Sequence, residues 1–174
     1  MRYIFAFIMG IFISTVSSAQ SDNTPVVQGK SSFFAEGGGP GIMFSLNIDR
    51  RFSNSRFGFG GRAGLGFVTG WQEEQQMNWE LTSAITVPVQ FNYVFGKENS
   101  SHALEAGAGF TYVSKKMDIM EFYDRKQSQL FGTVSFMYRR QPKEGGFSWR
   151  AGFSPLIGKN LIQLFGGVSL GYNF

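Results

Sequence analysis

The chain has 174 residues, a formal net charge of +4 at pH 7 and no cysteine, and it contains 23 glycines, 20 phenylalanines and five prolines. The absence of cysteine excludes disulfides and thiolate metal sites, and because the basic residues are scattered, the positive charge does not indicate nucleic-acid binding. So much glycine and phenylalanine is unusual in a water-soluble domain and suits a narrow barrel with a crowded interior and an apolar outer face.

The N-terminus has the features of a secretory signal peptide. Arg2 supplies positive charge, an apolar run covers residues 3–13, and small residues at 17–19 precede a predicted cleavage site after Ala19. The apolar run is shorter than the roughly 20 residues that a membrane-spanning helix needs. We therefore expect a signal peptide over 1–19, followed by a flexible periplasmic lead over 20–30.

Eight segments of alternating apolar and polar residues follow, separated by turn residues. In a strand, this alternation places apolar side chains on one face and small or polar side chains on the other. The last segment has Val168, Leu170, Tyr172 and the terminal Phe174 on one face, as in the assembly strand of an outer-membrane barrel. The pattern predicts an all-β fold, an eight-stranded antiparallel up-and-down transmembrane β-barrel over 31–174. The expected strands are 32–38, 42–52, 57–69, 80–95, 102–114, 129–139, 147–154 and 164–174.

The connections favour a barrel with both ends in the periplasm. The inner turns are then 53–55, 96–101 and 141–146, and the outer connections are 37–41, 70–78, 115–128 and 155–160. The two longest connections fall outside, as this class of barrel requires. Outward aromatic side chains should form a girdle at each rim, with Phe57 at the inner one. Residues 32–52 could instead form one bent strand, which would give an odd strand number.

The inward-facing positions carry both signs of charge. An eight-stranded barrel is only wide enough for its own side chains, and unpaired charges inside it would be costly. We therefore expect structural ion pairs that close the lumen rather than a gated pore, with Arg62, Glu105 and Arg150 meeting above Asp49 and Arg51. The inward charged set is Glu36, Asp49, Glu80, Glu105, Arg51, Arg62, Arg139 and Arg150.

The sequence offers little for catalysis. Enzymes of this barrel class would place a histidine beside a serine or an acid near the outer rim, but His102, the single histidine, opens a strand at the inner rim. Ser100 and Ser101 fit a turn. The run Gly37–Gly41 lacks the strand-to-helix context of a phosphate-binding loop, and no cluster has metal-ligand spacing. We predict no enzymatic activity, no metal and no cofactor.

The longest outer connection is the best candidate for a contact surface. Its basic residues could bind lipopolysaccharide phosphates, and its aromatic residues could anchor a partner. The alternative is a simple extension of two strands beyond the membrane. The candidate residues are Lys115, Lys116, Phe122, Tyr123, Arg125 and Lys126.

Five blocks resemble small outer-membrane β-barrel proteins of Gram-negative bacteria, the OmpA/OmpX-type barrel domain, and in particular uncharacterised barrels of Bacteroidota-type outer membranes. They are LNIDRRF (46–52), GRAGLG (61–66), PVQFNY (88–93), LEAGAG (104–109) and RAGFSP (150–155). The resemblance implies a fold, an outer-membrane location and insertion by the barrel-assembly machinery, but no reaction. One departure is Ser169, where the assembly signal usually has glycine.

These observations together predict a monomeric barrel in contact with outer-membrane lipid and lipopolysaccharide, with a structural or surface-interaction role and no nucleic-acid partner. A small porin-like channel or a carrier of hydrophobic solutes is the first alternative, which a continuous cavity or a lateral gap between strands would favour. A lipid-modifying enzyme is the second. A soluble lipocalin-like barrel is a further alternative for the fold, against which the apolar outward faces argue.

Overall fold

The computed structural model describes residues 29–74, 78–117, 119, 129–158 and 162–174. The predicted signal peptide, its cleavage site and residues 20–28 of the predicted lead lie outside the described residues. So do four residues of the candidate contact loop, namely Phe122, Tyr123, Arg125 and Lys126.

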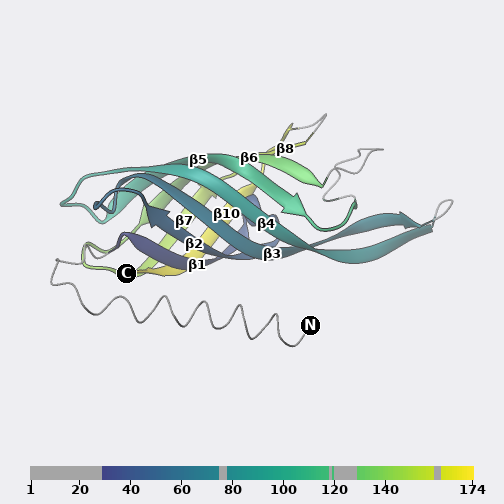
Figure 1. Ribbon diagram of the computed structural model, residues 1–174, viewed down its shortest axis with the longest axis horizontal. Coiled ribbons are helices and arrows are strands. Elements are labelled where there is room, and N and C mark those ends of the chain that lie inside the picture. The colour runs from purple at the N-terminus through teal and green to yellow at the C-terminus, as the bar shows by residue number, and fades with distance from the viewer. Residues whose placement is uncertain (1–28, 75–77, 118, 120–128, 159–161) are drawn as a thin grey trace.

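The described strands form one antiparallel sheet that closes on itself (Figure 1). Pairing of β1 with β10 and of β5 with β6 completes the ring. A single-turn 3-10 helix, η2 (Gly39–Gly41), connects the first two strands. The strands are β1 (Ser31–Gly38), β2 (Phe44–Arg51), β3 (Gly58–Glu74), β4 (Asn78–Gly96), β5 (His102–Val113), β6 (Leu130–Arg140), β7 (Gly146–Phe153), β8 (Leu156–Ile157), β9 (Ile162–Gln163) and β10 (Gly166–Asn173).

The two shortest strands prolong longer ones rather than adding to the barrel. β8 pairs with β6 in the same register as β7, and β9 pairs with β8 in the same register as β10 with β7. The Ser154 N–H donates to the Phe165 carbonyl (2.6 Å) and the Val134 N–H to the Pro155 carbonyl (3.2 Å), which bridges both breaks. The barrel therefore has eight strands, and residues 32–52 form two of them. The expected outer connection 155–160 is wrong in part, because Leu156 and Ile157 continue the strand.

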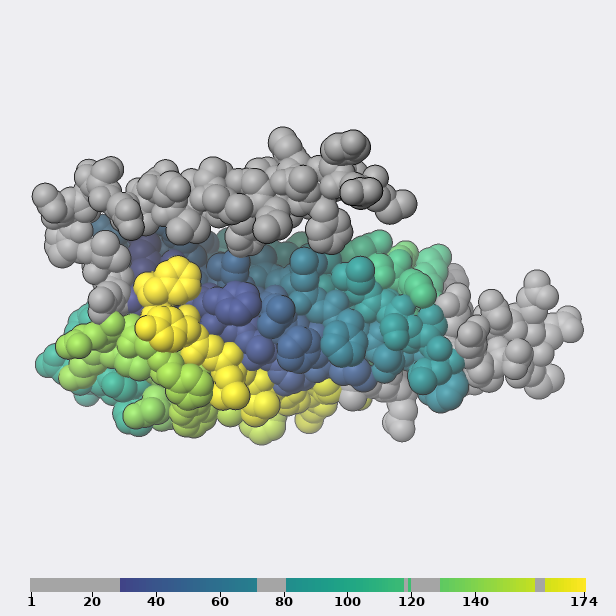
Figure 2. Space-filling view, turned by 90° about the horizontal axis from the view of Figure 1, so that it is seen from below, coloured from purple at the N-terminus to yellow at the C-terminus, as the bar shows by residue number. Residues whose placement is uncertain are grey.

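The two ends of the barrel differ. One, the short-turn end, carries the connections 52–57, 97–101 and 141–145. The start of β1 and the end of β10 lie together at this end, where Ser31 and Phe174 exchange backbone hydrogen bonds of 3.0 and 2.8 Å. Figure 2 shows the purple first strand beside the yellow last one. The other, the long-loop end, carries η2 and the connections after β3, β5 and β8. Figure 1 shows β3 and β4 running past the other strands at this end.

The outer wall is apolar because alternate residues of every long strand point away from the axis. Exposed large side chains include Phe91 at 70% and Phe153 at 69%. The four outward residues of the C-terminal strand, Val168, Leu170, Tyr172 and Phe174, are exposed as well. A water-soluble protein rarely shows apolar surface of this extent. Among the described residues, no helix is long and apolar enough to cross a bilayer.

Candidate functional site

Five charged side chains meet in the middle of the barrel, and we name them the central charge cluster: Asp49, Arg51, Glu105, Arg139 and Arg150. Each is at most 2% exposed. Arg139 Nη1 lies 2.8 Å from Asp49 Oδ2 and 3.1 Å from Glu105 Oε2. Arg150 lies 3.6 Å from Asp49 and 3.4 Å from Glu105, and Arg51 contacts Asp49. Two carboxylates from β2 and β5 are thus shared by three guanidinium groups from β2, β6 and β7.

Amide and hydroxyl groups add further contacts to this cluster. The Asn92 amide nitrogen donates to Asp49 (3.2 Å) and to Glu105 (3.0 Å), and its oxygen accepts from Arg51 (2.7 Å). Arg150 Nη2 donates to the hydroxyl of Ser32 at 3.0 Å. The alternation of residues in β4 predicts that Asn92 faces inward. Its contacts with Asp49 and Glu105 could not be predicted, because they depend on how far along the barrel axis β4 places Asn92.

Arg62 forms an ion pair outside the central charge cluster. Its Nη2 lies 2.6 Å from Glu36 Oε2, and no ion pair joins it to Glu105 among the described residues. The expected meeting of Arg62 with Glu105 and Arg150 is therefore corrected to a pair with Glu36. Phe34, 1% exposed, lies between the two groups: its ring centroid is 3.7 Å from the Arg150 guanidinium carbon and 5.4 Å from that of Arg62. Cation–π contacts of this kind are favourable.

Phe34 was missed among the inward residues. It stands two positions before Glu36 on the same strand, so the period of two already places it on the inward face. The side chain of Glu80, also expected to face inward, lies outside the described residues.

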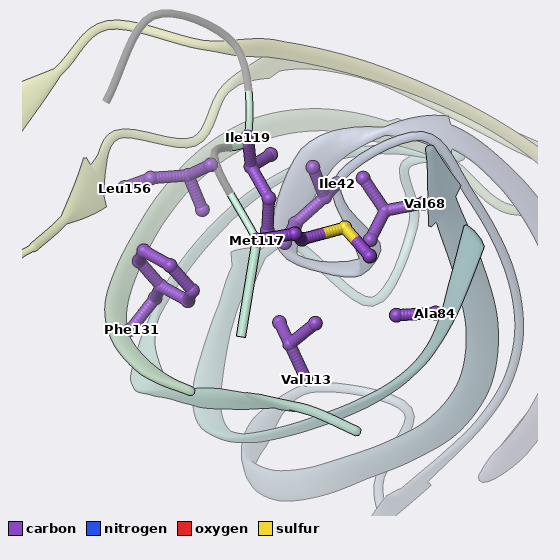
Figure 3. Close-up of a cluster of buried hydrophobic side chains, with 8 residues drawn as sticks. All are labelled: Ile42, Val68, Ala84, Val113, Met117, Ile119, Phe131 and Leu156. Atoms are coloured by element: carbon purple, nitrogen blue, oxygen red, sulfur yellow. The ribbon is translucent and has the colours of Figure 1, made fainter. Parts of the chain in front are cut away.

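The long-loop end of the interior is apolar rather than charged. Eight buried side chains from around the ring point toward one another there, as Figure 3 shows, and Phe165 packs against them. We name this set the apolar cluster: Ile42, Val68, Ala84, Val113, Met117, Ile119, Phe131 and Leu156.

The turn η2 lies inside the barrel and forms the boundary between the charged and apolar layers. All three of its residues are buried. The Thr86 hydroxyl donates to the Gly41 carbonyl (3.1 Å) and the Thr111 hydroxyl to the Pro40 carbonyl (2.5 Å). The glycine run 37–41 is thus a turn, as expected, but it folds into the lumen instead of standing outside it.

Arg56 closes the short-turn end, a role that sequence reasoning missed. It is 4% exposed, and its guanidinium donates to the carbonyls of Glu98 (2.5 Å), Ser100 (2.8 Å) and Pro142 (3.4 Å). These carbonyls belong to the two other turns of this end, so one side chain ties three turns together. Burial lowers the pKa of Arg56, and the Glu98 carboxylate 3.8 Å away opposes that effect.

Phe57 packs inside this end with Val94 and Ala103. It is 9% exposed, so the prediction that it belongs to an outward aromatic girdle is wrong. The Arg56 guanidinium carbon lies 4.6 Å from the centre of the Phe57 ring. The alternation that defines β3 begins at Gly58, whose φ is 89°, and the turn before it directs Phe57 inward.

His102 is exposed and shares a hydrogen bond with the Tyr138 hydroxyl on the neighbouring strand. Ser100 accepts a hydrogen bond from the His102 N–H (3.1 Å), and the Ser101 carbonyl accepts one from Gln141 (2.9 Å), as turn residues do. In the part of the chain that the structure describes, no three histidine, cysteine, aspartate or glutamate side chains are grouped so that they could hold a metal ion.

The described start of the candidate contact loop folds over the mouth of the barrel. Lys115 Nζ donates to the Thr82 hydroxyl at 3.0 Å, and Lys116 is exposed. Met117 and Ile119 are 2% and 1% exposed because they enter the apolar cluster. Of the candidate contact residues, only Lys116 is therefore a free surface cation within the described residues.

Neither the protein-family models nor the curated proteins include a match to this chain. Among solved structures, it is similar to the crystal structure of the N-terminal β-barrel domain of Pseudomonas aeruginosa OprF. The match covers 84% of this chain and 99% of that one, with a TM-score of 0.54 and 12% sequence identity. An identity this low speaks to the fold alone. The chain adopts the closed eight-stranded antiparallel barrel fold of the OmpA/OmpX type.

Proposed function

We propose that this protein is a non-conducting, non-catalytic β-barrel of a Gram-negative outer membrane, with a structural or surface-interaction role. The observation that carries the proposal is the central charge cluster. Its guanidinium and carboxylate groups come from β2, β5, β6 and β7 and contact one another within 3.6 Å. A barrel of eight strands leaves an interior that side chains alone can fill, so this cluster occupies the path that ions would take.

Two further layers support a closed interior. At the long-loop end, η2 and the apolar cluster fill the lumen, and at the short-turn end Arg56 and Phe57 lie across it. An ion crossing the barrel would have to displace ion pairs that are buried on all sides and then enter an apolar layer. Both steps are costly, because a charge leaves water without a compensating partner.

The outer surface supports a location in a lipid bilayer. Exposed aromatic and aliphatic side chains cover the outer wall, and the strands pair into a closed ring. The outward apolar face of β10 is suited to recognition by the barrel-assembly machinery. Lys116 at the long-loop end is available to lipopolysaccharide phosphates. Export by the predicted signal peptide over 1–19 is part of this proposal.

The position of His102 supports a protein without catalysis. The side chain lies on the outer face near the short-turn end and contacts Tyr138. A lipid-modifying enzyme would need its histidine, with a serine or an acid, at the opposite end.

The proposed orientation places the short-turn end in the periplasm and the long-loop end outside the cell. It therefore predicts different labelling of cysteines at the two ends. The chain contains no cysteine, so each single substitution supplies one thiol. A cysteine that replaces Lys116, at the long-loop end, should react with a membrane-impermeant maleimide on intact cells. A cysteine that replaces Glu144, exposed at the short-turn end, should react only after the outer membrane is permeabilised. Equal labelling of both variants on intact cells, or the reverse order, would contradict the proposal.

A further inference from the structure

Two strands of the barrel wall stop short at the long-loop end. The hairpin of β1 and β2 closes with a 2.9 Å hydrogen bond from the Gly38 N–H to the Met43 carbonyl, and η2 then folds inward. Pairing of β2 with β3 ends at Phe44 and Phe67, and pairing of β1 with β10 ends at Gly38 and Gly167. β3 continues past this hairpin on one side, and β9 prolongs β10 on the other. We name the resulting gap in the described wall the lateral notch.

The lateral notch contains an apolar pocket of about 250 Å³. None of its lining side chains is charged, and its single hydroxyl, on Thr69, donates to the Met43 sulfur at 3.7 Å. Two members of the apolar cluster, each 1% exposed, form its floor, so the pocket ends inside the barrel without continuing as a passage. The lining residues are Gly38, Ile42, Met43, Val68, Thr69 and Phe165.

The floor of the pocket depends on an unusual backbone conformation. Ile42 has φ of 75°, in the left-handed region that β-branched residues rarely adopt. Its N–H donates to the Gly39 carbonyl (3.0 Å), and its side chain is buried in the apolar cluster. Strained residues of this kind persist where the surrounding structure enforces them, and they concentrate at binding sites.

The pocket opens sideways onto the apolar outer wall. Phe44 and Phe67, whose ring centroids are 5.9 Å apart, lie beside its opening, and both are exposed. Farther along the two flanking strands, Trp71 is 53% and Leu164 is 80% exposed, so the apolar wall continues past the notch on both sides. The mouth of the barrel at the long-loop end is not open in this way, because Met117 covers the interior there. Access is therefore from the side that would face lipid.

We propose that the lateral notch binds one acyl chain of a surrounding membrane lipid. The proposal rests on the membrane-spanning function proposed above. Hydrocarbon is the chemistry that fits, because the lining carries no free polar side chain and the opening is continuous with the apolar wall. Because the pocket has a closed floor, it retains a lipid at the wall and does not carry solutes through the barrel.

The test uses a phospholipid with a photoreactive diazirine in the middle of its acyl chain, in vesicles that contain the full chain in folded form. Crosslinks are mapped by peptide mass spectrometry. We expect them to concentrate on Met43 and Phe165, above the level that their exposed area alone would give. Thr69→Trp, which fills the pocket, should lower this labelling several-fold. Ser83→Trp is the matched control, because Ser83 pairs with Thr69 across β3 and β4 but does not line the pocket.

The outcomes separate the two proposals. Labelling that follows exposed area around the whole wall, or equal labelling in T69W and S83W, would overturn the acyl-chain site and leave the membrane barrel standing. A chain that gives no lipid crosslink anywhere is not inserted, which would overturn the proposed function and the site with it. If T69W does not show the heat-modifiable gel mobility of a folded barrel, Thr69→Leu fills the pocket with a smaller side chain and carries the same expectation.

Discussion

Replacement of Asp49 by asparagine is expected to lower the free energy of unfolding by about 3–5 kcal/mol, the usual cost of removing one partner from a buried ion pair. Asp49 is 1% exposed and contacts the guanidinium groups of Arg51, Arg139 and Arg150. Asparagine keeps the size of the side chain but removes the charge. Arg139 and Arg150 would then share the single carboxylate of Glu105, and Arg51 would lose its ion pair, all in a buried interior.

Denaturant unfolding of the refolded protein in detergent micelles, followed by tryptophan fluorescence, measures this loss. Glu144→Gln is the control, because it removes one negative charge from an exposed turn and should change stability by less than about 0.5 kcal/mol. In the double variant D49N/R139Q, the loss should be smaller than the sum of the two single losses, since the two side chains are direct partners. A D49N variant as stable as E144Q would contradict the pairing.

Replacement of Gly109 by alanine is expected to cost about 3 kcal/mol, through overpacking of the interior. A Cβ at this position would lie 2.0 Å from the Val89 carbonyl oxygen and 2.8 Å from the Gln90 Cγ. The oxygen belongs to the backbone of the neighbouring strand, so β4 and β5 would have to separate to admit the methyl group. A Cβ at Gly64 or Gly152 would likewise lie too close to the backbone of a neighbouring strand, so crowding explains the glycines at these inward positions.

Gly37→Ala is the matched control for this substitution. Gly37 also lies in a strand, but its Cβ would have no heavy atom within 4 Å. Alanine there restricts the unfolded chain and should raise stability by about 0.4–1 kcal/mol. The same denaturant titration measures both variants. Equal stabilities for G109A and G37A would show that the interior is not packed as tightly as described.

The alternation of apolar and polar residues was sufficient to predict eight strands and the inward position of the charged residues. It does so because the period of two fixes which face each residue takes, whatever the neighbouring strands do. Asp49, Arg139 and Glu105 therefore face inward as predicted. The period does not predict which charged side chains form ion pairs, because the partners depend on the stagger between strands around the ring. That is why Arg62 is found with Glu36 instead of Glu105.

Connections were harder to predict than strands. Nothing in the glycine run at 37–41 indicates that it folds into the barrel, since this requires space that other strands leave at the same height. Arg56 and Phe57 were missed for a related reason. They follow a turn, where the alternation is interrupted. The contacts of Arg56 are with carbonyl groups 42 and 86 residues away in sequence, and Phe57 packs against Val94 and Ala103 of two other strands.

Single-channel recording in a planar bilayer tests most directly the claim that paired charges close the barrel. The refolded protein is added after its heat-modifiable gel mobility has confirmed a folded barrel. The closed interior predicts that inserted protein gives no conductance steps. Steady, ion-selective openings would contradict it, since they would make the central charge cluster the lining of a pore.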